Sequence, residues 1–218
     1  GSLVPKEILS IVPKEAKLID TSDLTMKQIE QLYIRAKELN VDVARVHSGD
    51  VSVYGALSEQ ITLLQKHNID FQIVPGIPAY VEAAAQLKTE LTAPGQVQSV
   101  ILTRTSFGST PMPEGEDLKT FAKTGATLVI HLSIRRLNYI YRELTPILGD
   151  DAIVAVLYRI GWPDQQIILD RLDNIASRVR EKKITRTALI ITGKNFKKKS
   201  DINSVLYDEN FNHLFRPK

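Results

Sequence analysis

The chain has 218 residues, of which 43% are hydrophobic, enough for the packed core of one large domain or two smaller ones. The net charge of +3 identifies no partner, and the basic residues are dispersed without interleaved aromatics, which argues against nucleic-acid binding. The absence of cysteine excludes disulfides, thiolate metal sites and a cysteine nucleophile. With no signal-peptide layout and no long apolar run, we expect a cytoplasmic protein without a membrane span.

The first half of the chain alternates short apolar runs with helical periodicity, a pattern typical of a parallel sheet covered by helices. Thr25 and Gln28 have the spacing of a capping box at the start of the first helix. The predicted strands are 17–20, 41–46 and 70–76, and the predicted helices are 25–40, 55–67 and 79–87.

The second half of the chain has the pattern of a mixed sheet, unlike the mostly parallel sheet predicted for the first half. A cluster of Thr, Pro and Gly at 89–99 marks the expected boundary, which gives domains 1–93 and 94–218. The connection 160–165 is too short for a crossover helix, so the strands on either side form an antiparallel hairpin and the second sheet is mixed. The predicted strands are 99–104, 126–133, 152–159, 165–170 and 186–193, and the predicted helices are 135–148 and 171–184.

Polar residues follow several predicted strands, at the place where open α/β sheets bind ligands. The stretch "RVHSGDVSVYG" (45–55) is one example, since it brings a carboxylate and backbone N–H groups to a strand end. The alternative is that the aspartate caps a helix and the arginines are solvated. The four histidines lack metal-ligand spacing, so we predict no metal site. Signatures of serine hydrolases, nucleotide triphosphatases and dinucleotide enzymes are missing, and we name no catalytic residue.

Seven segments occur in the order and spacing of one known family and span nearly the whole chain. They are "RVHSGDVSVYGALSEQI", "IVPGIPAYVEAAA", "LTAPGQVQSVILTR", "TPMPEGEDL", "ATLVIHLS", "VLYRIGWPDQQII" and "ITRTALIITG". By these segments the chain resembles the tetrapyrrole methylases. Its "TPMPEGE", "YRIGWPDQ" and opening "GSLVP" most resemble the subgroup that methylates precorrin-4, or cobalt-precorrin-4, at C-11 in cobalamin biosynthesis.

The resemblance implies a homodimer of two-domain α/β subunits that bind S-adenosylmethionine in a cleft between the domains and methylate a ring carbon of a precorrin. The cofactor residues that it implies are Gly49, Asp50, Val53, Pro78, Ala79, Leu132 and Ala188. Because a precorrin bears many carboxylates, basic and aromatic residues are expected to bind it. The substrate residues that we predict are Tyr54, Arg104, Arg135, Arg159 and Trp162.

The chain departs from the family pattern in several places. Members usually begin with a strand and a G-x-G-P-G-D loop before the segment that matches "GSLVP", so we expect the first sheet to be truncated and one wall of the cofactor pocket to be missing. Val51 replaces an expected proline, Ser109 an arginine and Gly161 a threonine. The alternative to an active enzyme is therefore a truncated, inactive homologue that binds tetrapyrroles or serves a structural role.

Overall fold

The computed structural model describes residues 3–106, 110–197, 211, 212, 214 and 216. The chain forms two compact units, Gly1–Ala79 and Tyr80–Lys218. Helix α4, which the sequence analysis placed in the first domain, thus groups with the second unit except for its first residue. The boundary expected between residues 93 and 94 stays a prediction.

The first unit contains α1 (Lys6–Leu9), α2 (Met26–Glu38) and α3 (Leu57–Lys66). The predicted capping box of α2 is confirmed: the backbone N–H of Gln28 donates to Thr25 Oγ1, and the Gln28 side chain accepts from the backbone N–H of Thr25. The two longer helices are those that the apolar periodicity predicted.

A buried glutamine holds the first unit together. Gln60 is only 4% exposed, and its Oε1 accepts hydrogen bonds from the Tyr33 hydroxyl and from Arg45 Nε, both at 3.0 Å. Its Nε2 donates to the carbonyls of Gly55 and Ala56. One side chain of α3 therefore connects α2, an extended segment and the loop before α3, because a buried amide is stable only when its donors and acceptors are paired.

The mostly parallel sheet predicted for the first half is not formed in residues 3–79. The segments 17–20, 41–47 and 70–78 carry no strand assignment, and no backbone hydrogen bond joins them. Side-chain contacts connect them instead, such as Arg45 Nη1 to Thr21 Oγ1 at 2.6 Å. Their apolar side chains stay on the surface, as at Val43 and Val74, which are 50% and 73% exposed. Without ladder hydrogen bonds and a buried face, β-branched composition alone does not make a strand.

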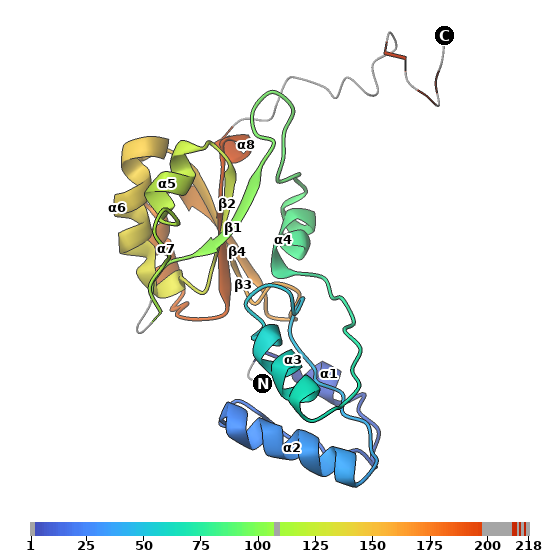
Figure 1. Ribbon diagram of the computed structural model, residues 1–218. Coiled ribbons are helices and arrows are strands. Elements are labelled where there is room, and N and C mark those ends of the chain that lie inside the picture. The colour runs from blue at the N-terminus through green and yellow to red at the C-terminus, as the bar shows by residue number, and fades with distance from the viewer. Residues whose placement is uncertain (1–2, 107–109, 198–210, 213, 215, 217–218) are drawn as a thin grey trace. The chain divides into compact units, whose positions relative to one another are not determined.

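The second unit contains the mixed sheet that the sequence predicted (Figure 1). Its strands are β1 (Val100–Arg104), β2 (Thr127–His131), β3 (Ile153–Tyr158), β4 (Gln166–Arg171) and β5 (Ala188–Thr192). Its helices are α4 (Ala79–Leu87), α5 (Leu118–Lys123), η1 (Ile134–Arg136), α6 (Leu137–Leu148), α7 (Ile175–Glu181) and α8 (Lys194–Lys197). Helix α5 was not predicted, although Asp117 caps it by accepting from the Thr120 N–H at 2.9 Å.

The strand order β1-β2-β5-β3-β4 defines two ends of this sheet. β1 and β2 are parallel, whereas β5 pairs antiparallel with both β2 and β3, and the β3–β4 hairpin is confirmed. At one end, named the Arg104 end, β1, β2 and β3 finish and β4 and β5 begin. At the other, named the Arg171 end, β1, β2 and β3 begin and β4 and β5 finish.

The core lies between this sheet and one layer of helices. Figure 1 shows α5, α6 and α7 on one face of the sheet and α4 on the other. Ile140 and Leu144 of α6 and Ile190 of β5 are at most 1% exposed and belong to one apolar cluster. Burial of this kind is the main stabilising contribution to the unit.

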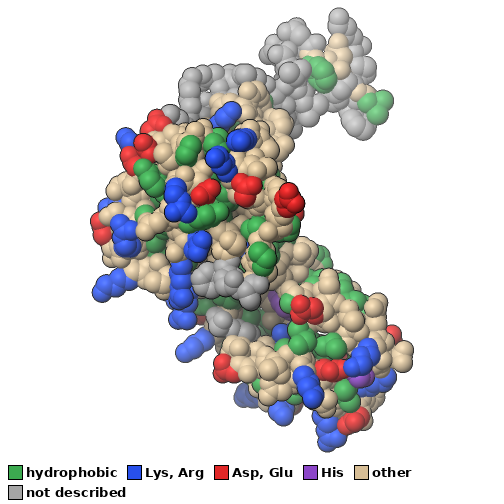
Figure 2. Space-filling model, turned by 60° about the vertical axis from the view of Figure 1, so that its left-hand side comes forward, with side chains coloured by type: hydrophobic (Ala, Val, Ile, Leu, Met, Phe, Trp, Pro, Cys, Tyr) green, Lys and Arg blue, Asp and Glu red, His purple; other side chains and the backbone are tan. Residues whose placement is uncertain are grey.

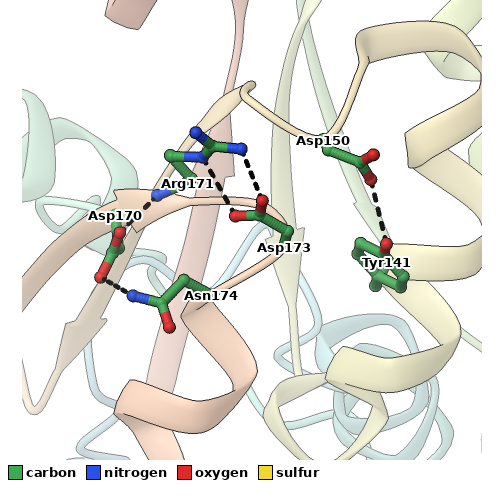
Figure 3. A network of polar contacts seen from close by, with 6 residues as sticks. All are labelled: Tyr141, Asp150, Asp170, Arg171, Asp173 and Asn174. Carbon is green, nitrogen blue, oxygen red and sulfur yellow. Dashed lines mark hydrogen bonds and ion pairs between the residues drawn. The ribbon is translucent and has the colours of Figure 1, made fainter.

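Polar contacts close the Arg171 end (Figure 3). The Tyr141 hydroxyl donates to Asp150 Oδ1 at 3.0 Å, and Arg171 binds Asp173 through two hydrogen bonds of 3.1 and 2.6 Å. Asn174 donates to Asp170 at 2.7 Å. Each charged group at this end that Figure 3 draws has a polar partner from a neighbouring turn or helix.

The face of the molecule that Figure 2 shows is not dominated by one charge. On the face that Figure 2 shows, Lys and Arg side chains alternate with acidic and apolar ones. Among the helices of the described residues, none combines the length and the apolar character that crossing a bilayer requires.

Candidate functional site

The loop predicted to bind the cofactor lies against the turn before α4. Gly49 has a φ of +66°, a left-handed conformation that glycine adopts without strain. A methyl group built on Gly49 would lie 3.5 Å from the Ile77 carbonyl oxygen and 3.7 Å from the Ala79 nitrogen. The structure therefore brings Gly49 together with Pro78 and Ala79, as the resemblance implied.

Gly76 is essential to this contact and was not predicted as a site residue. A methyl group on Gly76 would lie 2.0 Å from the Gly49 carbonyl oxygen, far inside van der Waals contact. The signal in the sequence was the Pro75-Gly76 pair, which marks a turn but does not say what approaches it.

Asp50 joins the same two loops through its carboxylate. Oδ2 accepts from the Gly76 N–H at 2.9 Å, and Oδ1 accepts from the Ser52 N–H at 2.8 Å and from the Ser52 hydroxyl. The Ser52 side chain, the Gly76 N–H and the Ser52 N–H together lower the pKa of Asp50, so the carboxylate is ionised at neutral pH. Asp50 thus holds the loop in place.

The loop ends in a tight turn over residues 51–54, which contains Val53. Tyr54 and Ala56 have φ values of +56° and +50° on either side of Gly55, where a methyl group would lie 2.3 Å from the Val51 carbonyl oxygen. Tyr54 is 47% exposed.

The remaining predicted residues belong to the second unit, where the Arg104 end gathers them. Arg104 ends β1 and pairs with His131, the last residue of β2. The β2–β5 register, continued by two residues, places Leu132 opposite Ala188, and Ala188 also pairs with Tyr158 at the end of β3. Arg104, which the sequence placed at a strand end, therefore lies at the same end of the sheet as Leu132 and Ala188, which the resemblance implied.

Three residues next to strands at the Arg104 end are left-handed without being glycine. Leu132, Arg159 and Thr187 have φ values of +53°, +46° and +52°, and the Arg159 N–H donates to the Thr187 carbonyl at 2.8 Å. Such a conformation costs about 1–2 kcal/mol for a residue with a side chain, and it concentrates at functional sites. Thr187 has no signal in the sequence, since threonine disfavours this conformation.

Two of the arginines at this end bind backbone carbonyls. Arg104 donates to the carbonyl oxygens of Thr105, Thr110 and Pro111 at 3.2–3.3 Å, and Arg135 Nε donates to the Thr185 carbonyl at 3.0 Å. Among the described residues neither has a carboxylate partner, so both keep a net positive charge for an anionic ligand.

Arg159 differs because its charge is already paired. It contacts Asp164 at 2.5 Å and lies over the Trp162 ring, with 3.9 Å between the guanidinium carbon and the ring centroid. This cation–π contact orients both side chains. Gly161, at a φ of +80°, occupies the turn between them, a position that suits glycine better than the threonine expected from the family.

His131 brings no positive charge to this end. Burial lowers its pKa, so the imidazole is neutral at neutral pH. Within the described part of the chain, no three His, Asp or Glu side chains are grouped as metal ligands would be. Ser109, the third departure from the family pattern, lies outside the described residues.

The predicted residues therefore form two groups, one in each unit. Gly49, Asp50, Pro78 and Ala79 meet in the first, and Leu132, Ala188, Arg104 and Arg159 gather at the Arg104 end of the second. Each group combines close backbone approach with strained or charged residues, which suits a ligand with polar and apolar parts.

Known proteins resemble this chain over most of its length. Residues 1–176 match the family described as tetrapyrrole (corrin/porphyrin) methylases. A precorrin-4 C(11)-methyltransferase from Sinorhizobium is 42% identical over 99% of this chain and 85% of its own length. A cobalt-precorrin-4 C(11)-methyltransferase from Methanocaldococcus jannaschii is 39% identical over 99% of this chain and 83% of its own.

Solved structures agree as well. A cobalt-precorrin-4 methyltransferase of cobalamin biosynthesis matches with a TM-score of 0.85 and 32% identity, over 89% of this chain and 82% of its own. A uroporphyrin-III C-methyltransferase from Thermus thermophilus, complexed with S-adenosyl homocysteine, shares the fold at a TM-score of 0.63 and 23% identity, over 79% of this chain and 74% of its own. The chain is a member of the tetrapyrrole methylase family.

Proposed function

We propose that this chain is an S-adenosylmethionine-dependent methyltransferase that methylates precorrin-4, or cobalt-precorrin-4, at C-11 in cobalamin biosynthesis. The observation that carries the proposal is the 42% identity to a precorrin-4 C(11)-methyltransferase over 99% of the chain. The matched region covers 99% of the chain and so spans the segments that contain both groups of candidate residues. The cytoplasmic location expected from the sequence stays a prediction.

We assign the cofactor contacts to Gly49, Asp50, Val53, Pro78 and Ala79 in the first unit and to Leu132 and Ala188 in the second. The left-handed Gly49 exposes backbone to a ligand, and the Asp50 bonds to Ser52 and Gly76 fix the loop that carries it. In the second unit, the exposed Leu132 and the small Ala188 offer an apolar surface of their own. When bound, S-adenosylmethionine supplies the methyl group from a sulfonium.

We assign the substrate contacts to Arg104, Arg135, Arg159, Trp162 and Tyr54. Arg104 and Arg135 have net charge to pair with carboxylates of a precorrin, and the Arg159–Trp162 stack offers a flat surface to a macrocycle. No side chain is assigned as a base, because methyl transfer to an electron-rich carbon depends mainly on alignment. We further propose that the chain acts as a homodimer.

A second candidate is a tetrapyrrole-binding protein without methyltransferase activity. The observation that favours it lies in the first unit, where the segments 41–47 and 70–78 on either side of the Gly49 loop carry no strand assignment and are joined by no backbone hydrogen bond. A loop supported in this way is less preorganised for a cofactor.

Calorimetric titration with S-adenosylhomocysteine separates the two candidates. The methyltransferase binds it at micromolar concentration, and Asp50→Ala weakens binding by roughly tenfold because the loop is released. The matched control is Asp117→Ala, which removes a carboxylate cap from α5 and leaves the affinity unchanged. A folded wild-type chain that binds a precorrin but no S-adenosylhomocysteine would establish the second candidate instead.

A further inference from the structure

A fully buried hydroxyl lies at the end of β2. Ser133 is 0% exposed, and its Oγ accepts from the Thr105 N–H at 2.8 Å and from the Thr105 hydroxyl at 3.0 Å. The same hydroxyl donates to the His131 carbonyl at 2.6 Å. A hydroxyl has one donor and two acceptor positions, so every hydrogen-bonding position of Ser133 is occupied.

These bonds enclose Leu132. The hydrogen bond from Ser133 Oγ to the His131 carbonyl spans Leu132, which lies between these two residues. Thr105, the residue that follows β1, fixes the Ser133 hydroxyl from the neighbouring part of the chain. Leu132 has a φ of +53°, which costs about 1–2 kcal/mol for leucine. Such a conformation persists only where its surroundings hold it.

Burial of the leucine side chain does not offset this cost. Leu132 is 67% exposed, so it gains little from packing in the protein alone. Leu132 directly follows the end of β2, and it is one of the residues that we assign to the cofactor. A strained, exposed leucine held by a saturated buried hydroxyl is therefore better explained by what Leu132 contacts in the bound state.

We propose that Ser133 is a positioning residue for the methyl-donor site, which holds Leu132 in the left-handed conformation that contacts bound S-adenosylmethionine. This inference rests on the proposed function. It adds to that function a residue that touches neither cofactor nor substrate and acts through Leu132.

The test compares affinities for S-adenosylhomocysteine in the 218-residue chain, at a temperature well below each unfolding midpoint. Ser133→Ala is expected to weaken binding roughly tenfold. Ser133→Cys keeps nearly the same side-chain volume but replaces the hydroxyl by a weak hydrogen-bond donor. If Ser133→Ala does not fold, Ser133→Cys takes its place, and we expect the same weakening of S-adenosylhomocysteine binding. The control is Thr192→Val, which removes a buried hydroxyl that donates to the Ile153 carbonyl at the Arg171 end. Thr192→Val lowers the midpoint but leaves the affinity within about twofold, since it lies away from Leu132.

A double-mutant cycle separates positioning from a merely structural role. Asparagine tolerates the left-handed conformation, so in a Leu132→Asn background Ser133→Ala is expected to weaken binding by less than about threefold. A structural role gives the same loss in both backgrounds. Amide hydrogen exchange of Thr105, without ligand, reports directly whether the Ser133 bond is lost.

The outcomes distinguish the two proposals. A folded wild-type chain that fails to bind S-adenosylhomocysteine overturns the proposed function, and the role of Ser133 with it. Wild-type binding with equal affinity in Ser133→Ala, while the Thr105 amide exchanges faster, overturns the role of Ser133 alone.

Discussion

The two ends of the second unit's sheet are built from the same strands but place their strain differently. At the Arg104 end, Leu132, Arg159 and Thr187 take left-handed conformations with full side chains. At the Arg171 end, the residues with a positive φ in the turns that lead into β2 and β3 are glycines, Gly125 and Gly149. Glycine adopts a positive φ without steric strain, so the turns at the Arg171 end are relaxed. The backbone at the Arg104 end is strained at these three residues, as expected where a ligand binds.

The charges at the two ends differ in the same way. At the Arg171 end, the arginine that Figure 3 draws is bound by a carboxylate in two hydrogen bonds. At the Arg104 end, Arg104 and Arg135 bind carbonyls and keep their net charge. Arg159, which is paired with Asp164, is the exception at the Arg104 end, so the contrast in charge rests on Arg104 and Arg135.

The largest expected effect comes from the core that both ends share. Ile190 of β5 is 0% exposed, and Ile190→Ala is expected to lower the free energy of unfolding by about 2–5 kcal/mol, since it leaves a cavity. Urea denaturation measures the loss. An unchanged midpoint would show that the two ends do not depend on a common core.

Glycine exchanges sharpen the comparison. Gly149→Ala puts a side chain at a φ of 84° and a ψ of 158°, a region that is essentially restricted to glycine, and is expected to cost about 1–3 kcal/mol. Leu132→Gly is expected to change stability by less than about 0.5 kcal/mol, because relief of strain offsets the entropy of glycine, and to weaken S-adenosylhomocysteine binding. Thermal unfolding measures the stability of the two variants, and calorimetric titration measures the affinity of Leu132→Gly for S-adenosylhomocysteine. A large loss of stability in Leu132→Gly would contradict the assignment of strain to the Arg104 end.

A fall in pH should destabilise the folded chain through His131, which lies at the Arg104 end. Burial lowers its pKa in the folded chain, so the unfolded chain takes up the proton at higher pH. An unperturbed histidine has a pKa of about 6.5, which we take for the unfolded chain. The neutral imidazole therefore contributes its full stability above about pH 6.5, and this contribution is lost as the pH falls from there toward the lower pKa of the folded chain. Urea unfolding midpoints measured at a pH above and a pH below the ordinary histidine pKa give the loss of stability. His131→Gln should remove the part of this pH dependence that His131 causes. Equal pH dependence in the variant would show that His131 is not the group responsible.

The smallest effect is expected at the exposed ion pair of the Arg171 end. Asp173→Asn removes the acceptor that Arg171 binds through two hydrogen bonds, and solvent screens both groups. We expect little change in the unfolding midpoint and none in S-adenosylhomocysteine affinity. A loss of affinity in this variant would remove the distinction between the two ends.

Local patterns in the sequence predicted most of the second unit. The β3–β4 hairpin followed from a connection too short for a helix, and the capping box of α2 from two residues three apart. The Asp117 cap of α5 carried a similar signal that went unused. Periodicity and caps act within a few residues, so the sequence displays them directly.

What the sequence could not predict depends on residues far apart in the chain. The contact of Ser133 with Thr105 spans 28 positions, and the close approach of Gly76 to Gly49 joins two loops. Left-handed Leu132 and Thr187 contradict their own preferences. In the first unit, strand-like composition did not produce strands, because pairing depends on partners and not on composition.

The strand order also has a consequence for biosynthesis on the ribosome. Among the strands of the described residues β5 comes last in sequence, but it lies between β2 and β3, so the β1–β2 pair and the β3–β4 hairpin cannot join into one sheet until β5 has been synthesised. Until then, the β5-facing backbone groups of β2 and β3 lack their partners. A nascent chain that has reached α7 should therefore be a client for chaperones, and its compaction should be coupled to the emergence of β5 from the exit tunnel.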